Sequence, residues 1–183
     1  MNIHSLEENI VGDRCVLEPI LPKHAALLFD DLQSLELYRY IPHEPPVSLR
    51  ALQDRYKAWS ARGSSDGNET WLNYAVYGPK MGRYLGTLQA TLHKEGKTDI
   101  AYEVFPPYWR QGVGRETVSL LTSCLFGGFD VELATAHVDT ENTRSIKLLE
   151  RLGFTRTAFL KNADYFKGRA SDEYVFELHA RDV

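Results

Sequence analysis

One stretch of the sequence has the residue types of an anion-binding loop: the segment from Trp109 to Arg115, WRQGVGR. Hydrophobic periodicity predicts a strand before it, over residues 99–105, and a helix after it, over residues 116–126. The first N–H groups of a helix have no acceptor within the helix and lie at the positive end of its dipole. A loop between a strand and a helix N-terminus can therefore hold a phosphate or another anion.

Two glycines and two arginines give this loop its predicted chemistry. Gly112 and Gly114 have no side chain, so a phosphate could reach the backbone, and Arg110 and Arg115 would add fixed positive charge. The alternative is a βα turn whose glycines serve only steric needs. The loop is not a Walker A motif, because no Gly-Lys-Ser/Thr follows, and Thr117 stands where a dinucleotide fingerprint has its third glycine.

The elements that would position this loop follow from the hydrophobic pattern. Further strands are predicted over residues 14–20, 70–77, 84–92, 131–138, 154–160 and 172–179, and further helices over 22–34, 48–62 and 142–152. Ser48 is the expected N-cap of one helix, Asn142 or Thr140 that of another, and Gly153 is a good residue to end the latter. This order predicts a single α+β domain over residues 1–183, with a mixed, mostly antiparallel sheet of about seven strands and about four helices.

Composition excludes several classes of protein. With 183 residues, 43% hydrophobic and 25% charged, the chain can build a sizeable core, and its net charge of −4 argues against a chain-wide nucleic-acid footprint. Cys15 and Cys124 are too few for a disulfide scaffold, which indicates a cytoplasmic protein with reduced thiols. The six histidines are scattered, so no metal site is expected. No apolar run approaches the ~20 residues of a membrane span, so no membrane partner is expected.

Three stretches resemble the GNAT superfamily of acetyl-CoA-dependent N-acetyltransferases. AYEVFPPYWRQGVGRE is similar to the acyl-CoA motif of the family, HVDTENTRSIKLLERLGF resembles its Asn-x-x-(Ala/Ser) helix, and DYFKGRASDEYVFEL extends the likeness to the end of the chain. The resemblance is to the branch of ribosomal-protein N-terminal (Rim-type) acetyltransferases, although Trp109 replaces the usual Arg or Gln of the first motif. It implies a GNAT sheet that is splayed between the fourth and fifth predicted strands, which the prolines after Phe105 favour.

The resemblance implies acetyl-CoA as the co-substrate and names the positions that would bind it. The strand before the loop would offer backbone groups to the pantetheine arm, and the loop N–H groups would hold the pyrophosphate. Asn142 matches the cofactor-contacting asparagine of the family, and it can also act as a helix N-cap. The implied cofactor-binding residues are Val104, Phe105, Arg110, Gln111, Gly112, Val113, Gly114, Arg115 and Asn142.

Direct transfer of an acetyl group to an amine needs a base, an oxyanion site and help for the departing thiolate. Glu103 is the base candidate, because strand alternation points it away from Tyr102 and Val104; the alternative is an exposed glutamate of the sheet. The backbone N–H near Val104 would bind the oxyanion. Many members of the family carry a tyrosine acid where this chain has Leu149, so the resemblance passes that role to Ser145, which could instead only pack on the cofactor.

The predicted function is transfer of an acetyl group from acetyl-CoA to a primary amine. The acceptor site is expected between the first two helices, in the aromatic segment that holds Tyr38, Tyr40 and Glu44, with Trp71 of the next strand; the two tyrosines could also simply cap the core. The branch implies a protein N-terminal α-amine, and small amines such as polyamines or aminoglycosides stay open. Two other classes of protein stay possible: a CoA-binding module without turnover, and a protein that binds a different nucleotide. The sequence does not decide the oligomeric state, and a homodimer is one possibility.

Overall fold

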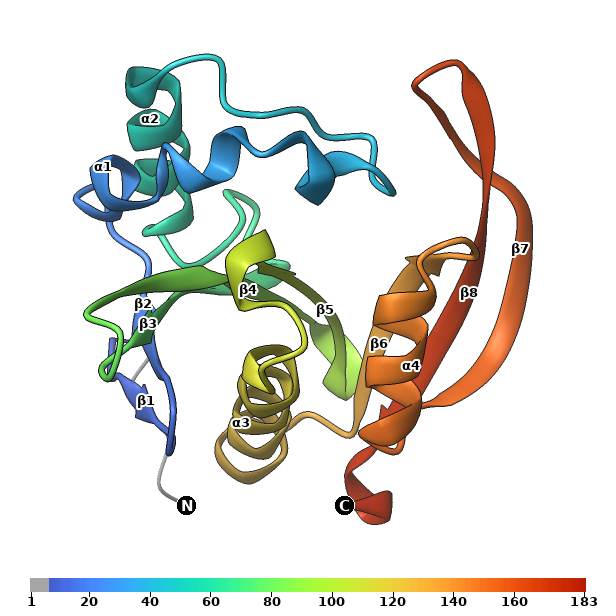
Figure 1. Cartoon of the computed structure of the whole chain (residues 1–183). Coiled ribbons are helices and arrows are strands. Elements are labelled where there is room, and N and C mark those ends of the chain that lie inside the picture. Colours follow the sequence, from blue (N-terminus) through green and yellow to red (C-terminus); the bar gives the residue numbers. More distant parts are fainter. Residues whose placement is uncertain (1–6) are drawn as a thin grey trace.

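The structure is a computed structural model that describes residues 7–183, and its centre is one open sheet of eight strands (Figure 1). The strands are β1 (Ile10–Val11), β2 (Val16–Pro19), β3 (Glu69–Gly78), β4 (Arg83–His93), β5 (Lys97–Val104), β6 (Leu133–Asp139), β7 (Thr155–Phe166) and β8 (Arg169–His179). The α-helices are α1 (His24–Leu28), α2 (Leu49–Trp59), α3 (Val113–Gly128) and α4 (Thr143–Arg151). The α+β class with a mostly antiparallel mixed sheet is therefore confirmed.

The sheet opens in its middle, between β5 and β6. The strand order is β1-β2-β3-β4-β5-β6-β8-β7, and all neighbours are antiparallel except β5 and β6. These two strands pair only at Lys97 with Leu133, Thr98 with Ala134 and Asp99 with Thr135, and they diverge beyond that point. The splay is thus where it was predicted. The one strand beyond those expected is β1, a two-residue strand at the edge of the sheet.

Helices cover the two faces unequally. Helices α3 and α4 lie on one face, α3 against β4 and β5 and α4 in front of β6, whereas α1 and α2 pack together beyond the other face of β3 and β4 (Figure 1). The core forms mainly between the sheet and α3. Fully buried side chains in this layer include Leu88 of β4, Leu121 and Leu125 of α3, Leu149 of α4 and Phe176 of β8.

Two predicted helices differ from the observed ones. The helix expected over residues 22–34 is only the five-residue α1, followed by short 3-10 turns over Asp31–Gln33 and Leu35–Tyr38. The backbone stays in the helical region at Phe29 and Asp30 but tightens into a 3-10 turn, as is common at helix ends, and the extended Ser34 separates the two turns. Helix α3 begins at Val113, three residues before the predicted start, so Gly114 and Arg115 belong to its first turn. The anion loop is correspondingly shorter and joins the helix directly.

The last two strands form a longer hairpin than predicted. Strand β7 continues to Phe166, past the expected end at Leu160, because the polar residues in between pair with β8 again after an irregularity of register. The hairpin turns through Lys167 and Gly168, both with positive φ, as a two-residue turn requires. The hairpin therefore extends beyond the sheet as an arm that approaches the segment before α2 (Figure 1).

The predicted helix caps are confirmed where side chains carry them. Ser48 Oγ accepts from the N–H of Ala51 at 3.1 Å, and Asn142 Oδ1 accepts from the N–H of Ser145 at 3.2 Å. Gly153 follows α4 with φ of +88°, in the left-handed region that favours glycine. Within residues 7–183, no helix has the length and apolar character needed to cross a membrane.

Candidate functional site

The loop between β5 and α3 presents a row of unpaired N–H groups. Arg110 and Gly112 both have positive φ, at 62° and 83°, which turns successive peptide groups toward one side. Among residues 7–183, no backbone or side-chain acceptor is hydrogen-bonded to the N–H groups of residues 110–115. These groups lie at the N-terminus of α3, which is 16 residues long. The loop therefore has the geometry of an anion site, at the position that the sequence indicated.

The two glycines of the loop do different work. A Cβ atom at Gly112 would meet nothing closer than Arg14 Nη1 at 3.8 Å, so this face of the loop is open. A Cβ atom at Gly114 would lie 3.1 Å from Leu148 Cδ2 and 3.6 Å from Val104 Cγ2. Gly112 thus leaves room for a ligand, whereas Gly114 allows α4 and β5 to approach the start of α3.

A third arginine joins the loop from a distant part of the chain. Arg14 Nη1 donates to the carbonyl of Gln111 at 3.2 Å, and Arg14 Nε lies 3.6 Å from Glu116 Oε2. Arg14, Arg110 and Arg115 are all largely exposed, and the Arg14 guanidinium lies beside the open face of Gly112. Sequence reasoning missed Arg14, because it precedes the loop by almost a hundred residues and no local pattern connects them.

The edge of β5 at the splay offers one backbone position in particular. The N–H of Phe105 donates to the carbonyl of Leu85 at 2.8 Å, toward β4, so the N–H of Val104 points the other way, toward the splay. The carbonyl of Val104 accepts from the indole Nε1 of Trp109, and the guanidinium carbon of Arg144 lies 3.5 Å from the centre of that indole ring. Of the two positions predicted to meet pantetheine, Val104 therefore has the available N–H, while that of Phe105 is engaged in the sheet.

Helix α4 brings a hydroxyl group to the same region. Ser145 Oγ lies 2.6 Å from the hydroxyl oxygen of Tyr102, on β5. Leu149, at the position of the usual tyrosine acid, is fully buried. Asn142 is the N-cap of α4, and its contact with a cofactor stays a prediction. Ser145 therefore presents a hydroxyl group near the start of α4, and its role toward a departing thiolate stays a prediction.

Glu103 faces the opposite side of β5 and is half-buried, so its alternative interpretation as an exposed sheet residue is wrong. Burial raises the pKa of Glu103, while a hydrogen bond from Thr87 Oγ1 at 3.1 Å and the charges of His43 and Arg55 lower it in part. Burial, and then the nearby charge of Glu103, raise the pKa of Tyr38 and of Tyr56. Glu103 therefore lies in a partly desolvated region beneath the segment between α1 and α2, with a raised pKa that makes it a stronger base.

The predicted acceptor segment is held by the hairpin arm. Lys167 Nζ donates to the carbonyls of Tyr38, Ile41 and His43 at 2.6, 2.9 and 3.1 Å, and it lies 3.5 Å from Glu44 Oε1. We call this set of contacts the Lys167 clasp. The clasp holds the carboxylate of Glu44 beside Lys167, although 62% of the Glu44 side chain is exposed. No local pattern in the sequence indicates the clasp, because its partners are more than 120 residues apart.

The tyrosines and the tryptophan of the predicted acceptor site do not all meet. Tyr38 is buried and donates to the carbonyl of Leu32 at 2.8 Å, so its ring serves the core, while Tyr40 is half-buried beside Arg39. Trp71 shares a sheet face with Glu103 but lies two strands away, and the strand register offsets it by four positions, about 13 Å along the strands at 3.3 Å per residue. Its indole donates to Glu69 Oε2 at 2.8 Å. The role of Tyr40 and Glu44 at the acceptor site stays a prediction.

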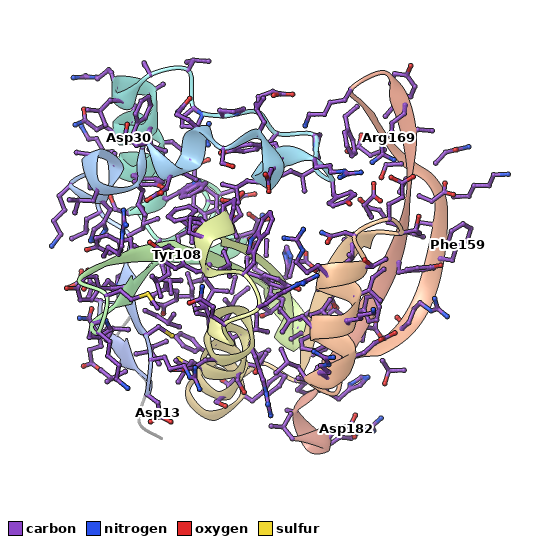
Figure 2. All side chains as sticks on the ribbon, viewed as in Figure 1. Asp13, Asp30, Tyr108, Phe159, Arg169 and Asp182 are labelled. Carbon is purple, nitrogen blue, oxygen red and sulfur yellow. The ribbon has the colours of Figure 1, made fainter. Side chains whose placement is uncertain are left out.

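A buried carboxylate joins β6, α4 and the hairpin arm. Asp139, whose side chain is 1% exposed, accepts from Arg169 Nη2 at 3.0 Å, from Ser171 Oγ at 2.8 Å and from the N–H of Glu141 at 2.8 Å. Figure 2 shows Arg169 on the upper part of the arm and Tyr108 at the start of the anion loop, on opposite sides of the splay. The Asp139 network fixes the residues that lead into α4. It could not be predicted from the sequence, because each of its side chains taken alone resembles an ordinary polar residue at the end of a strand.

Two other kinds of chemistry receive no support in this part of the chain. Within residues 7–183, no group of histidine, cysteine, aspartate and glutamate side chains could hold a metal ion. Burial raises the pKa of Cys15 to about 12 and raises that of Cys124, so both thiols are protonated and poor nucleophiles. The site is therefore one of an anion loop, a free strand edge, a carboxylate and a hydroxyl.

A splayed sheet with an anion loop on one side and a half-buried carboxylate on the other defines an acyl-CoA type of transferase. Residues 14–155 match the acetyltransferase (GNAT) domain, and the chain belongs to this family. The chain is 25% identical to YoaA of Bacillus subtilis, an uncharacterized N-acetyltransferase. The similarity covers 91% of this chain and 93% of YoaA. The enzyme class is accordingly that of an N-acetyltransferase.

Solved structures share the fold at lower identity. RimJ of Mycobacterium smegmatis, determined with CoA-disulfide, superposes with a TM-score of 0.85 at 17% identity, covering 97% of this chain and 90% of that one. RimL, a ribosomal L7/L12 alpha-N-protein acetyltransferase determined with CoA, superposes with a TM-score of 0.81 at 17% identity, covering 94% and 98%. The single GNAT fold with its open sheet is therefore well established.

Proposed function

We propose that the chain transfers an acetyl group from acetyl-CoA directly to a primary amine, with a protein N-terminal α-amine as the acceptor. The observation that carries the proposal is the row of unpaired N–H groups at residues 110–115, beside the open face of Gly112. These groups fit the pyrophosphate of CoA. The CoA complexes of two proteins with the same fold are in keeping with this choice of donor.

The residues of the chain divide the chemistry between the two faces of β5. Glu103 takes a proton from the ammonium form of the acceptor, directly or through a water, and its raised pKa suits that task. The N–H of Val104 stabilises the oxyanion that forms when the amine attacks the thioester carbonyl. Ser145 donates a hydrogen bond to the sulfur as the carbon–sulfur bond breaks. Acetyl-CoA supplies the activated acetyl group, and no acyl-enzyme is required.

The choice of a protein α-amine rests on the acceptor segment and on the branch. The Lys167 clasp fixes the backbone between Tyr40 and Glu44, and burial, then the charge of Glu103 and more weakly that of Glu44, raises the pKa of Tyr38 in the same segment. A carboxylate and an aromatic ring suit a cationic chain end. RimL, which has the same fold, is an alpha-N-protein acetyltransferase, and the motifs of the chain resemble the Rim-type branch.

The test is release of free CoA thiol from acetyl-CoA in the presence of matched acceptors. One peptide is offered with a free N-terminus, and the same peptide with an acetylated N-terminus and a free lysine side chain is the control. We expect thiol release with the first only. Thiol release with spermidine or an aminoglycoside but with neither peptide would show that the acceptor is a small amine and not a protein N-terminus. Binding of acetyl-CoA without any amine-dependent thiol release would indicate a CoA-binding module without turnover.

A further inference from the structure

The hydroxyl of Tyr102 makes a contact that the proposed chemistry does not use. Tyr102 lies on β5 directly before Glu103, and its side chain points to the face covered by α4. Its hydroxyl oxygen is 2.6 Å from Ser145 Oγ, and geometry alone allows either group to donate. The two residues come from elements on opposite sides of the splay and are 43 positions apart in sequence.

The direction of this hydrogen bond decides what Ser145 can do. If Ser145 donates to Tyr102, its only proton is occupied, and it offers no donor to another atom. If Tyr102 donates to Ser145, the proton of Ser145 is free to point toward the splay, where a leaving sulfur would lie. The position of Ser145 itself is fixed by its N–H, which donates to Asn142 Oδ1 at 3.2 Å.

We propose that Tyr102 is a positioning residue that donates to Ser145 Oγ and thereby directs the hydroxyl proton of Ser145 toward the sulfur that leaves. This inference rests on the proposed function. The nitrogen–carbon bond forms and the nitrogen gives up its second excess proton to water; the carbon–sulfur bond breaks, and the sulfur takes the electron pair while it accepts the hydrogen bond from Ser145. The thiolate later takes a proton from water, and neither hydroxyl is consumed.

The ionisation of Tyr102 supports a positioning role over that of an acid. Burial raises the pKa of Tyr102 to about 12, and the hydrogen bond with Ser145 lowers it in part. An ordinary thiol has a pKa of about 8.5, so a thiolate is too weak a base to remove the proton of Tyr102. Tyr102 therefore keeps its proton at neutral pH and holds Ser145 in one orientation.

Kinetics of three variants test the proposal. Tyr102→Phe keeps the ring and removes the hydroxyl, and we expect kcat to fall about fivefold, the effect of one neutral hydrogen bond, with KM for acetyl-CoA little changed. Because Tyr102 acts through Ser145, the double variant Tyr102→Phe with Ser145→Ala should be no slower than Ser145→Ala alone. Tyr77→Phe, the same change on β3 beside Tyr84, is the matched control and should keep full activity.

A second measurement needs no turnover. The thiol pKa of bound CoA, followed by thiolate absorbance, should be higher in Tyr102→Phe and in Ser145→Ala than in the wild type, and by similar amounts. Losses of kcat that multiply in the double variant, or variants that titrate like the wild type, would overturn the proposal. A wild type that releases no thiol with any amine would instead refute the proposed function, and the titration would still decide the role of Tyr102.

Discussion

Placing a negative charge at Gly112 gives a direct test of the anion loop. Gly112→Glu puts a side chain into the open space beside the unpaired N–H groups, where the nearest atom to a new Cβ is Arg14 Nη1 at 3.8 Å. Because φ is +83° at this position, any side chain costs about 1–2 kcal/mol of folding free energy. Gly112→Gln has the same size and the same backbone cost, so it is the matched control.

The expected difference between the two variants follows from electrostatics. Two unit charges about 4 Å apart repel by about 4 kcal/mol at an effective dielectric constant of about 20. The loop is exposed and carries three arginines, so we expect about half of that, or about 2 kcal/mol, which is about 30-fold in the dissociation constant for acetyl-CoA.

Isothermal titration calorimetry at low and at high salt measures this difference. Raising the ionic strength from about 0.1 M to about 1 M shortens the screening length from about 10 Å to about 3 Å, so the ratio of the two dissociation constants should shrink toward one. Equal affinities of the Glu and Gln variants at low salt would refute the reasoning, because the pyrophosphate would then lie away from Gly112.

Four further substitutions address the rest of the site. Glu103→Gln should lower kcat, most strongly above the raised pKa of Glu103, where the wild-type carboxylate is ionised and can act as a base, and least below it. Burial raises the pKa of Glu103, so this carboxyl favours folding below its unfolded pKa, and that contribution is lost as pH rises through its folded pKa. The Glu103→Gln variant should therefore have a higher melting temperature than the wild type at about pH 8 but not at about pH 4. Tyr40→Ala and Glu44→Ala should change KM for the acceptor and leave the dissociation constant of acetyl-CoA unchanged; the reverse pattern would move the acceptor site elsewhere. Asp139→Ala should destabilise the fold by about 3–5 kcal/mol in urea denaturation, since it leaves Arg169 and Ser171 without their buried partner, and a loss below about 1 kcal/mol would contradict that role.

Local chemistry allowed much of the fold to be predicted from the sequence. Alternation and helical spacing identified the central strands and α4, and the caps at Ser48 and Asn142 form as expected because a cap involves residues only three positions apart. The anion loop was predicted for the same reason, since its strand, turn and helix are contiguous. The position of the splay came from the family resemblance.

The parts of the site that could not be predicted depend on contacts between distant segments. From the sequence, Lys167 and Gly168 predict only a turn. The tertiary structure alone brings the ammonium group of Lys167 to the carbonyls of Tyr38, Ile41 and His43. The contacts of Arg14 and of the Asp139 network could not be predicted for the same reason, since they also join distant segments. The true length of β7 was missed because its polar residues resemble a loop, and pairing with β8 overrides that preference.

The narrow join between β5 and β6 has a consequence for how the molecule opens. Three residue pairs link the first five strands to the last three, whereas seven pairs join β6 to β8 alone. Each part has its own ladder of hydrogen bonds, so apart from the two-residue edge strand β1 the weakest boundary of the sheet runs through its centre, and we expect the two parts to separate there by local unfolding. A co-substrate that spans the anion loop on one side and the start of α4 on the other would join the two parts, so that occupancy of the site and cooperativity of the whole fold rise together.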